Sequence, residues 1–226
     1  MPIHIKIKET AELYNVLRGN RHKNFQIDHD KPPRQWLHPT DRITPTDTDN
    51  TQEDETPINI YTDGSKSEQG VGAGIVIKRP GTLTVKLMYR MDTRCTNNQA
   101  DAFAILKALD DVQTEQENKE DKIVTVYTDS RMTLDSLNNT DKHMFLTEEI
   151  RQKVQVMVIR GWIIQFSWIK AHAGTSGNEL ADKLAKETSG KTEIPVSYNR
   201  IPKSAIKRDL EESSRKNWQR EWGDNK

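Results

Sequence analysis

Two stretches of the chain alternate apolar and polar residues and then reach an aspartate. Residues 58–62 lead into Asp63 and Gly64, and residues 123–128 lead into Asp129. Because residues two apart in a strand point to the same face, each stretch puts a tyrosine and its aspartate on one side. We expect the first strand to stop at Asp63 in a glycine turn. If both strands belong to one sheet, their carboxylates meet, and the repulsion between them favours a bound cation or proton.

The hydrophobic pattern predicts the remaining elements of a packed domain. Further strands are expected over residues 72–78, 84–89 and 162–169, and helices over residues 98–112, 132–137, 146–160, 177–188 and 203–222. Helical spacing predicts a buried stripe formed by Ala102, Ile105, Leu106 and Leu109 in one helix. In the helix over residues 146–160, Ile150, Val154 and Val158 lie one turn apart. Gly161 is expected to cap the helix over residues 146–160. Gly70, Gly72 and Gly74 are expected to lie where backbones approach closely. This order predicts an α/β fold with a mixed five-stranded sheet, three antiparallel strands followed by two parallel ones, flanked by helices.

Composition divides the chain into three parts. Residues 1–56 are rich in proline, histidine and charge, and we interpret them as an N-terminal extension and a linker to an upstream module. Residues 57–189 carry the packed pattern, and residues 190–226 form a C-terminal extension with a terminal helix. Along that helix Ile206, Leu210, Ser214 and Trp218 lie in register. This favours docking to another domain over nucleic-acid binding, because the charges of the helix nearly cancel. We expect the chain to be part of something longer.

Composition also narrows the class of protein. Only 33% of residues are hydrophobic and 30% are charged, the mean hydropathy is −0.86, and no apolar run is long enough to cross a bilayer. No signal peptide is recognisable, so we expect a soluble intracellular protein without a membrane partner. A single cysteine, Cys95, excludes an internal disulfide and a multi-cysteine zinc site. The 34 basic and 34 acidic residues balance, so net charge gives no argument for a nucleic-acid partner.

Four carboxylates come from four separate elements. Asp63 and Asp129 end strands, Asp101 begins a helix, and Asp182 lies on a later helix, one turn from Asn178. Such a set suits a pair of Mg²⁺ ions, which prefer oxygen ligands, activate water and stabilise a leaving oxygen in phosphoryl displacement. Taken singly, Asp101 also suits the dipole of its helix, and Asp182 also suits a solvated helix face.

Four short motifs occur within residues 57–189. They are Tyr-Thr-Asp-Gly-Ser at 61–65, Thr-Asn-Asn-Gln-Ala-Asp at 96–101, Tyr-Thr-Asp-Ser at 127–130 and Ile-Lys-Ala-His-Ala-Gly-Thr-Ser-Gly-Asn-Glu-Leu-Ala-Asp at 169–182. In order and spacing they resemble the type 1 ribonuclease H family. The sequence around these motifs is most similar to the ribonuclease H domain in the polyprotein of insect-type non-LTR retrotransposons. The resemblance implies a ribonuclease H-like fold, an RNA–DNA hybrid as substrate and a reverse transcriptase module as neighbour.

The resemblance implies a role for each matching residue. Asp63, Asp101, Asp129 and Asp182 would ligate two Mg²⁺ ions, for which Mn²⁺ can substitute. His172 matches a mobile histidine that assists proton transfer or product departure. The matching substrate contacts, to the RNA backbone, the minor groove and a DNA-strand phosphate, are Gly64, Ser65, Ser130, Asn97, Asn98, Gln99, Asn178, Arg94 and Thr96. Amides can both donate to and accept from the 2′-hydroxyl that marks RNA, although Asn98 equally suits the N-cap of its helix.

Two departures from the family pattern bear on activity. The family has glutamate where this chain has Asp101. The shorter side chain predicts slower cleavage and a preference for Mn²⁺, because positional errors near 1 Å can cost about 10²-fold in rate. A short loop with Lys142 and His143 replaces the basic handle helix of many members, which predicts weak, salt-sensitive hybrid binding.

Three function classes follow from this pattern. A metal-dependent endonuclease that cuts the RNA strand, leaving 3′-hydroxyl and 5′-phosphate ends, is favoured. A catalytically reduced hybrid-binding module stays open because of Asp101. A DNA-cutting transposase or integrase on the same fold is disfavoured, because the amide run at residues 97–99 suits a 2′-hydroxyl.

Overall fold

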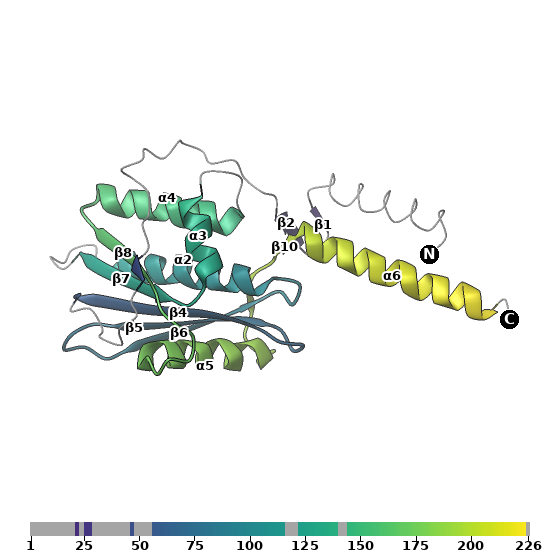
Figure 1. Cartoon of the computed structure of the whole chain (residues 1–226), viewed down its shortest axis with the longest axis horizontal. Coiled ribbons are helices and arrows are strands. Elements are labelled where there is room, and N and C mark those ends of the chain that lie inside the picture. The colour runs from purple at the N-terminus through teal and green to yellow at the C-terminus, as the bar shows by residue number, and fades with distance from the viewer. Residues whose placement is uncertain are drawn as a thin grey trace. The chain divides into compact units, whose positions relative to one another are not determined.

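The computed structural model describes residues 21–22, 25–28, 46–47, 56–115, 122–139 and 144–224 (Figure 1). The chain divides into two compact units, residues 30–198 and a second unit made of residues 1–29 with 199–226. Most of residues 1–56 and the loop with Lys142 and His143 lie outside the described residues. The domain boundaries that we expect near residues 56 and 189 therefore stay predictions.

A seven-stranded sheet forms the centre of the unit 30–198. Its strands are β3 (Thr46–Asp47), β4 (Ile58–Lys66), β5 (Val71–Lys78), β6 (Val85–Met91), β7 (Ile123–Thr128), β8 (Ile163–Trp168) and β9 (Val196–Tyr198). They lie in the order β3-β8-β7-β4-β5-β6-β9. β4, β5 and β6 pair antiparallel, and β7 and β8 follow β4 in parallel, which confirms the predicted mixed sheet. Two short parallel strands, β3 and β9, extend it at the edges and were not predicted.

Helices cover both faces of this sheet. They are α2 (Asn97–Glu115), α3 (Arg131–Asn138), α4 (Phe145–Ile159) and α5 (Ser176–Gly190). α5 lies on one face, and α2, with α3 and α4 beyond it, lies on the other (Figure 1). One member of the predicted stripe on α2 was wrong, because Leu106 is only half-buried. On α4, Ile150 is buried, Val154 is half-buried and Val158 is 53% exposed. On α4 the buried position belongs to Met157, because the stripe drifts by one residue around the helix.

Glycines allow α5 to approach the sheet closely. Gly72 and Gly74 lie two residues apart on β5 and face the helix. A Cβ built on Gly74 would lie 2.1 Å from the Ala181 carbonyl oxygen, and one on Gly72 would lie 2.3 Å from the Ala185 carbonyl oxygen. The predicted close approach is therefore a contact between strand and helix backbones.

β4 and β7 run side by side in register. Tyr61 pairs with Tyr127 and Thr62 with Thr128, so Asp63 follows at the level where β7 ends. The expected stop at Asp63 was wrong. β4 continues to Lys66 because its other neighbour, β5, keeps pairing with it up to that residue.

The end of α4 agrees with the sequence. Gly161 has a φ of +84°. Its N–H donates to the Val158 carbonyl at 2.9 Å, and the Trp162 N–H donates to the Met157 carbonyl at 3.1 Å. These two bonds form a Schellman motif, which confirms Gly161 as the helix cap.

The second unit contains a small sheet and a long helix. β2 (Phe25–Asp28) pairs antiparallel with β1 (Arg21–His22) and parallel with β10 (Arg200–Pro202). α6 (Lys203–Asp224) follows and confirms the predicted terminal helix. Within the described residues, no helix has the length and apolar character needed to span a membrane.

Candidate active site

The structure brings together the four predicted carboxylates. Asp63 lies within β4, Asp129 directly follows β7, Asp101 is on the second turn of α2, and Asp182 is on α5. Asp63 is 8% exposed and Asp101 is 3% exposed. Two strands and two helices from opposite faces of the sheet therefore contribute to one acidic cluster.

The pKa of Asp63 reflects the closeness of the other three carboxylates. Burial raises the pKa of Asp63 from 3.8 to about 8, assisted by the charges of Asp129 and Asp101 and by a hydrogen bond with Asp182. All three other carboxylates act on this one group. Without a cation, the cluster therefore favours a protonated Asp63.

Asp101 is held against β4. Burial raises the pKa of Asp101 to about 7, while hydrogen bonds from the Ser130 side chain and the Gly64 amide lower it and the Asp129 charge raises it. A Cβ on Gly64 would lie 2.6 Å from the Asp101 amide nitrogen. Gly64 therefore has a packing role, since it lets the start of α2 lie directly on the strand.

Asp129 and Asp182 have polar neighbours of their own. The Asn178 Nδ2 donates to the Asp129 carboxylate at 3.5 Å, and the Trp168 Nε1 donates to the Asp129 carbonyl at 3.1 Å. Lys186 Nζ pairs with Asp182 at 2.7 Å. Asn178 is buried next to Asp129, and its expected contact with substrate stays a prediction.

The cluster fits a hard divalent cation by its chemistry. Its donors are carboxylate oxygens, which Mg²⁺ prefers, and their mutual repulsion would be relieved by positive charge. Among the described residues, no group of three or more His, Cys, Asp or Glu side chains stands at the spacing of a formed metal site. An ion would therefore have to draw the carboxylates of Asp63 and its neighbours closer together.

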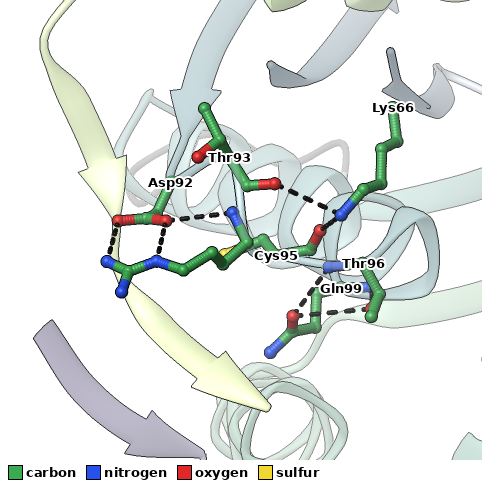
Figure 2. A network of polar contacts seen from close by, with 7 residues as sticks. Lys66, Asp92, Thr93, Cys95, Thr96 and Gln99 are labelled. Atoms are coloured by element: carbon green, nitrogen blue, oxygen red, sulfur yellow. Dashed lines mark hydrogen bonds and ion pairs between the residues drawn. The ribbon is translucent and has the colours of Figure 1, made fainter. Parts of the chain in front are cut away.

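The start of α2 is fixed by a capping box (Figure 2). The Thr96 Oγ1 accepts from the Gln99 amide at 3.1 Å, and the Gln99 Oε1 accepts from the Thr96 amide at 2.9 Å. Thr96 is thus the N-cap, and the alternative that Asn98 caps the helix was wrong. Gln99 has 0% exposure and works in the cap. Of the expected minor-groove residues, Asn97 is exposed and Asn98 is half-buried, and the groove contacts of all three stay predictions.

The loop before α2 is held by two residues that sequence reasoning missed. The Asp92 carboxylate accepts from the Arg94 Nε at 3.0 Å, from its terminal nitrogen at 3.1 Å and from its amide at 3.0 Å (Figure 2). Lys66 Nζ donates to the carbonyls of Thr93, at 3.2 Å, and Cys95. An aspartate two residues before Arg94 is a recognisable turn signal, whereas the Lys66 contact leaves no local signal. The expected phosphate contact of Arg94 and Thr96 stays a prediction.

The expected roles of His172, Ser65 and Ser130 stay predictions. His172 is exposed in the loop before α5 and has a φ of +53°, in the left-handed region that a non-glycine residue rarely adopts. Ser65 is half-buried on β4. The Ser130 and Thr133 hydroxyl oxygens lie 2.9 Å apart at the start of α3.

Comparison with known proteins identifies the class to which this fold and cluster belong. The RNase H family model matches residues 55–190, and the chain belongs to that family. Human Ribonuclease H1 is 30% identical over 152 residues, which cover 60% of this chain and 51% of the human protein. The chain thus spans about half the length of that relative.

Two further proteins are similar. Ribonuclease H of Trichodesmium erythraeum is 27% identical over 161 residues, which cover 63% of this chain and 95% of the relative. The crystal structure of LC11-RNase H1 in complex with RNA/DNA hybrid has 24% identity and a TM-score of 0.47, covering 57% of this chain and 97% of that one.

Proposed function

We propose that this chain is a ribonuclease H that hydrolyses the RNA strand of RNA–DNA hybrids with divalent metal ions. The observation that carries the proposal is the interaction of four carboxylates from four elements around Asp63, in a chain of the RNase H family. The relatives named above are ribonucleases H by their own names. The expected products keep a 3′-hydroxyl and a 5′-phosphate.

Asp63, Asp101, Asp129 and Asp182 would hold two Mg²⁺ ions. When bound, these ions would activate a water and stabilise the departing 3′ oxygen. All three other acids raise the pKa of Asp63, so its charge is the one that bound ions would relieve most. The Asn178 side chain orients the Asp129 carboxylate, and the hydrogen bonds from Ser130 and Gly64 orient the Asp101 carboxylate. His172, on its exposed loop, would move a proton at the departing oxygen or assist product release.

Substrate contacts would come from the loop before α2 and the start of that helix. Arg94 and Thr96 would take a DNA-strand phosphate, and Asn97 and Asn98 would face the 2′-hydroxyls of the RNA strand. Support comes from their position: Asn97 is exposed at the end of α2 that also carries Asp101. Gly64, Ser65 and Ser130 would lie along the RNA backbone.

The parent molecule is proposed to be a retroelement polyprotein with a reverse transcriptase module. The support is the amino-acid sequence of the motifs around Asp63, Asp129 and His172. Sequencing of the native transcript tests this. An open reading frame with polymerase motifs upstream is expected, and a frame without any polymerase motif would contradict it.

Cleavage of labelled substrates tests the activity. RNA–DNA hybrid, RNA duplex and DNA duplex are incubated with Mg²⁺, Mn²⁺ or a chelator. We expect cleavage of the hybrid RNA strand alone, and none with the chelator. Asp63→Asn should abolish cleavage while the protein stays folded, and Asp135→Asn, an exposed acid on α3, should cleave like the parent. Retained cleavage in Asp63→Asn would overturn the assignment.

A hybrid-binding module with reduced catalysis is the second candidate. Asp101 in place of the family's glutamate favours it, because a carboxylate one methylene short holds its ion less well. In that case the hybrid binds but stays intact with both metals.

A further inference from the structure

The end of β4 and the start of α2 are joined by a side chain. Lys66, the last residue of β4, extends its ammonium group to the carbonyl oxygens of Thr93, at 3.2 Å, and Cys95 (Figure 2). Hydrogen bonds from a charged donor are roughly twice as strong as neutral ones. Two carbonyls of one short loop therefore share a single cation that belongs to another element.

This contact lies beside a second one between the same two elements. Gly64 and Lys66 are two residues apart on β4 and point to the same side. The Gly64 amide donates to the Asp101 carboxylate, and its lack of a Cβ lets the α2 backbone lie on the strand. Lys66 and Gly64 thus hold successive parts of one segment, residues 93–101.

Burial and hydrogen bonds also join the rest of that segment to the first turn of α2. Cys95 is buried with 0% exposure, and the capping box of Thr96 and Gln99 ties the loop to the first turn of α2. On its other side, the Asp92 amide donates to the Tyr198 carbonyl of β9 at 2.9 Å. The loop is therefore held from two directions, and Lys66 supplies the hold on the side of β4.

We propose that Lys66 is a positioning residue that clamps the first turn of α2 onto β4 and so sets where the Asp101 carboxylate lies relative to Asp63. For its effect on rate, this inference rests on the proposed ribonuclease H function. Its effect on the helix start follows from the geometry alone. The competing role for an exposed lysine beside a nucleic-acid site is a direct contact to a phosphate.

Amide hydrogen exchange of the metal-free protein tests the clamp without any catalysis. Lys66→Met keeps the apolar stem and removes the ammonium. We expect exchange of the amides of residues 99–103 to accelerate about tenfold or more, with α5 unchanged. Lys86→Met, at an exposed position on β6, is the matched control and should leave both helices unchanged. Unchanged exchange at residues 99–103 in Lys66→Met would overturn the clamp.

Steady-state cleavage of the hybrid then separates positioning from phosphate contact. With the clamp, Lys66→Met lowers kcat about 10- to 10²-fold and leaves the salt dependence of binding unchanged, and Lys66→Arg restores part of kcat. A phosphate contact would instead raise KM without changing kcat. It would also reduce the slope of log binding constant against log salt concentration by about one, and these two results would overturn the proposal. If the parent cleaves no hybrid, the proposed function fails, while hydrogen exchange still decides the clamp.

Discussion

Tyr61 of β4 and Tyr127 of β7 stack on each other, with ring centroids 4.9 Å apart and planes inclined by 13°. Both rings are buried, and the two residues are direct partners in the parallel ladder. Two residues further on, the same faces carry Asp63 and Asp129. A slip of one residue would break this ring pair and turn one aspartate to the opposite face. The stacked rings therefore fix the pairing that brings the two acids together.

The metal-free protein should lose stability as the pH rises. The folded-state pKa of Asp63 is about 8, above its ordinary value of 3.8, so folding favours the protonated acid. Its stabilising contribution is complete below the unfolded-state pKa and is lost as the pH rises towards about 8. Thermal unfolding with a chelator, between about pH 5 and about pH 9, should show a falling Tm.

Two variants make this pH effect specific. Asp63→Asn cannot ionise, so its Tm should fall less over the same pH range. The Tm of Asp135→Asn, a change on the exposed side of α3, should fall as much as that of the parent. Equal pH slopes in all three proteins would show that Asp63 does not titrate in this range.

Asp101→Glu should accelerate cleavage. The Asp101 carboxylate accepts from the Gly64 amide and the Ser130 side chain, which hold it close to β4. One more methylene lets the carboxylate reach further from α2 towards the other acids, and a gain of up to about 10²-fold is expected. The rate is measured at saturating hybrid with Mg²⁺ and with Mn²⁺. If Asp101→Glu gives no gain with either metal, the shorter side chain does not limit the rate.

Gly74→Ala should destabilise the fold. The new Cβ would meet the Ala181 carbonyl oxygen at 2.1 Å, a backbone atom that can move only if α5 moves. Overpacking of this kind costs about 1–3 kcal/mol or more. Denaturant unfolding measures the loss. Leu83→Ala, at a residue before β6 that is 92% exposed, is the control, and its free energy of unfolding should change by no more than about 0.5 kcal/mol. An unchanged midpoint in Gly74→Ala would show that strand and helix are not in backbone contact.

Arg151→Met should stabilise the protein. Arg151 on α4 is 4% exposed, and none of its guanidinium nitrogens has a hydrogen-bond partner among the residues that the structure describes. Burial lowers the pKa of this guanidinium despite the nearby charge of Glu148. Methionine follows the same stem without the buried charge, so the free energy of unfolding should rise by about 1–3 kcal/mol. Gln155→Met on the same helix is the control, and a loss of stability in Arg151→Met would indicate a polar partner for the guanidinium.

Patterns within one element were readable from the sequence, and contacts between elements were not. The strand over residues 123–128 was predicted with its observed bounds because its run of β-branched and aromatic residues ends at an acid. β4 was cut short at Asp63 because its last residues lose the alternation, and only pairing with β5 keeps them in the sheet. β3 and β9, with two and three residues, are too short to show any period.

In the candidate site, too, the sequence shows the residue types but not the contacts between elements. The four acids stand out because carboxylates that meet at one site repel each other, and a bound cation relieves that repulsion. The roles of Gln99 and Lys66 depend on partners that a periodic pattern does not contain. Gln99 is expected to contact substrate, and the sequence does not reveal that its side chain also accepts from the Thr96 amide in the cap of α2. The role of Lys66 leaves no local signal in the sequence, because its partners lie 27 and 29 residues away in the chain.

The two edge strands affect how this protein can be shortened for experiments. β3 pairs with β8 and β9 pairs with β6, so each covers part of an outer strand of the central sheet. A fragment limited to residues 57–189 would lack both and would leave the hydrogen-bonding groups of β6 and β8 open to other chains. Open edges of this kind promote self-association. Fragments made for crystallisation or kinetics should therefore extend beyond both edge strands.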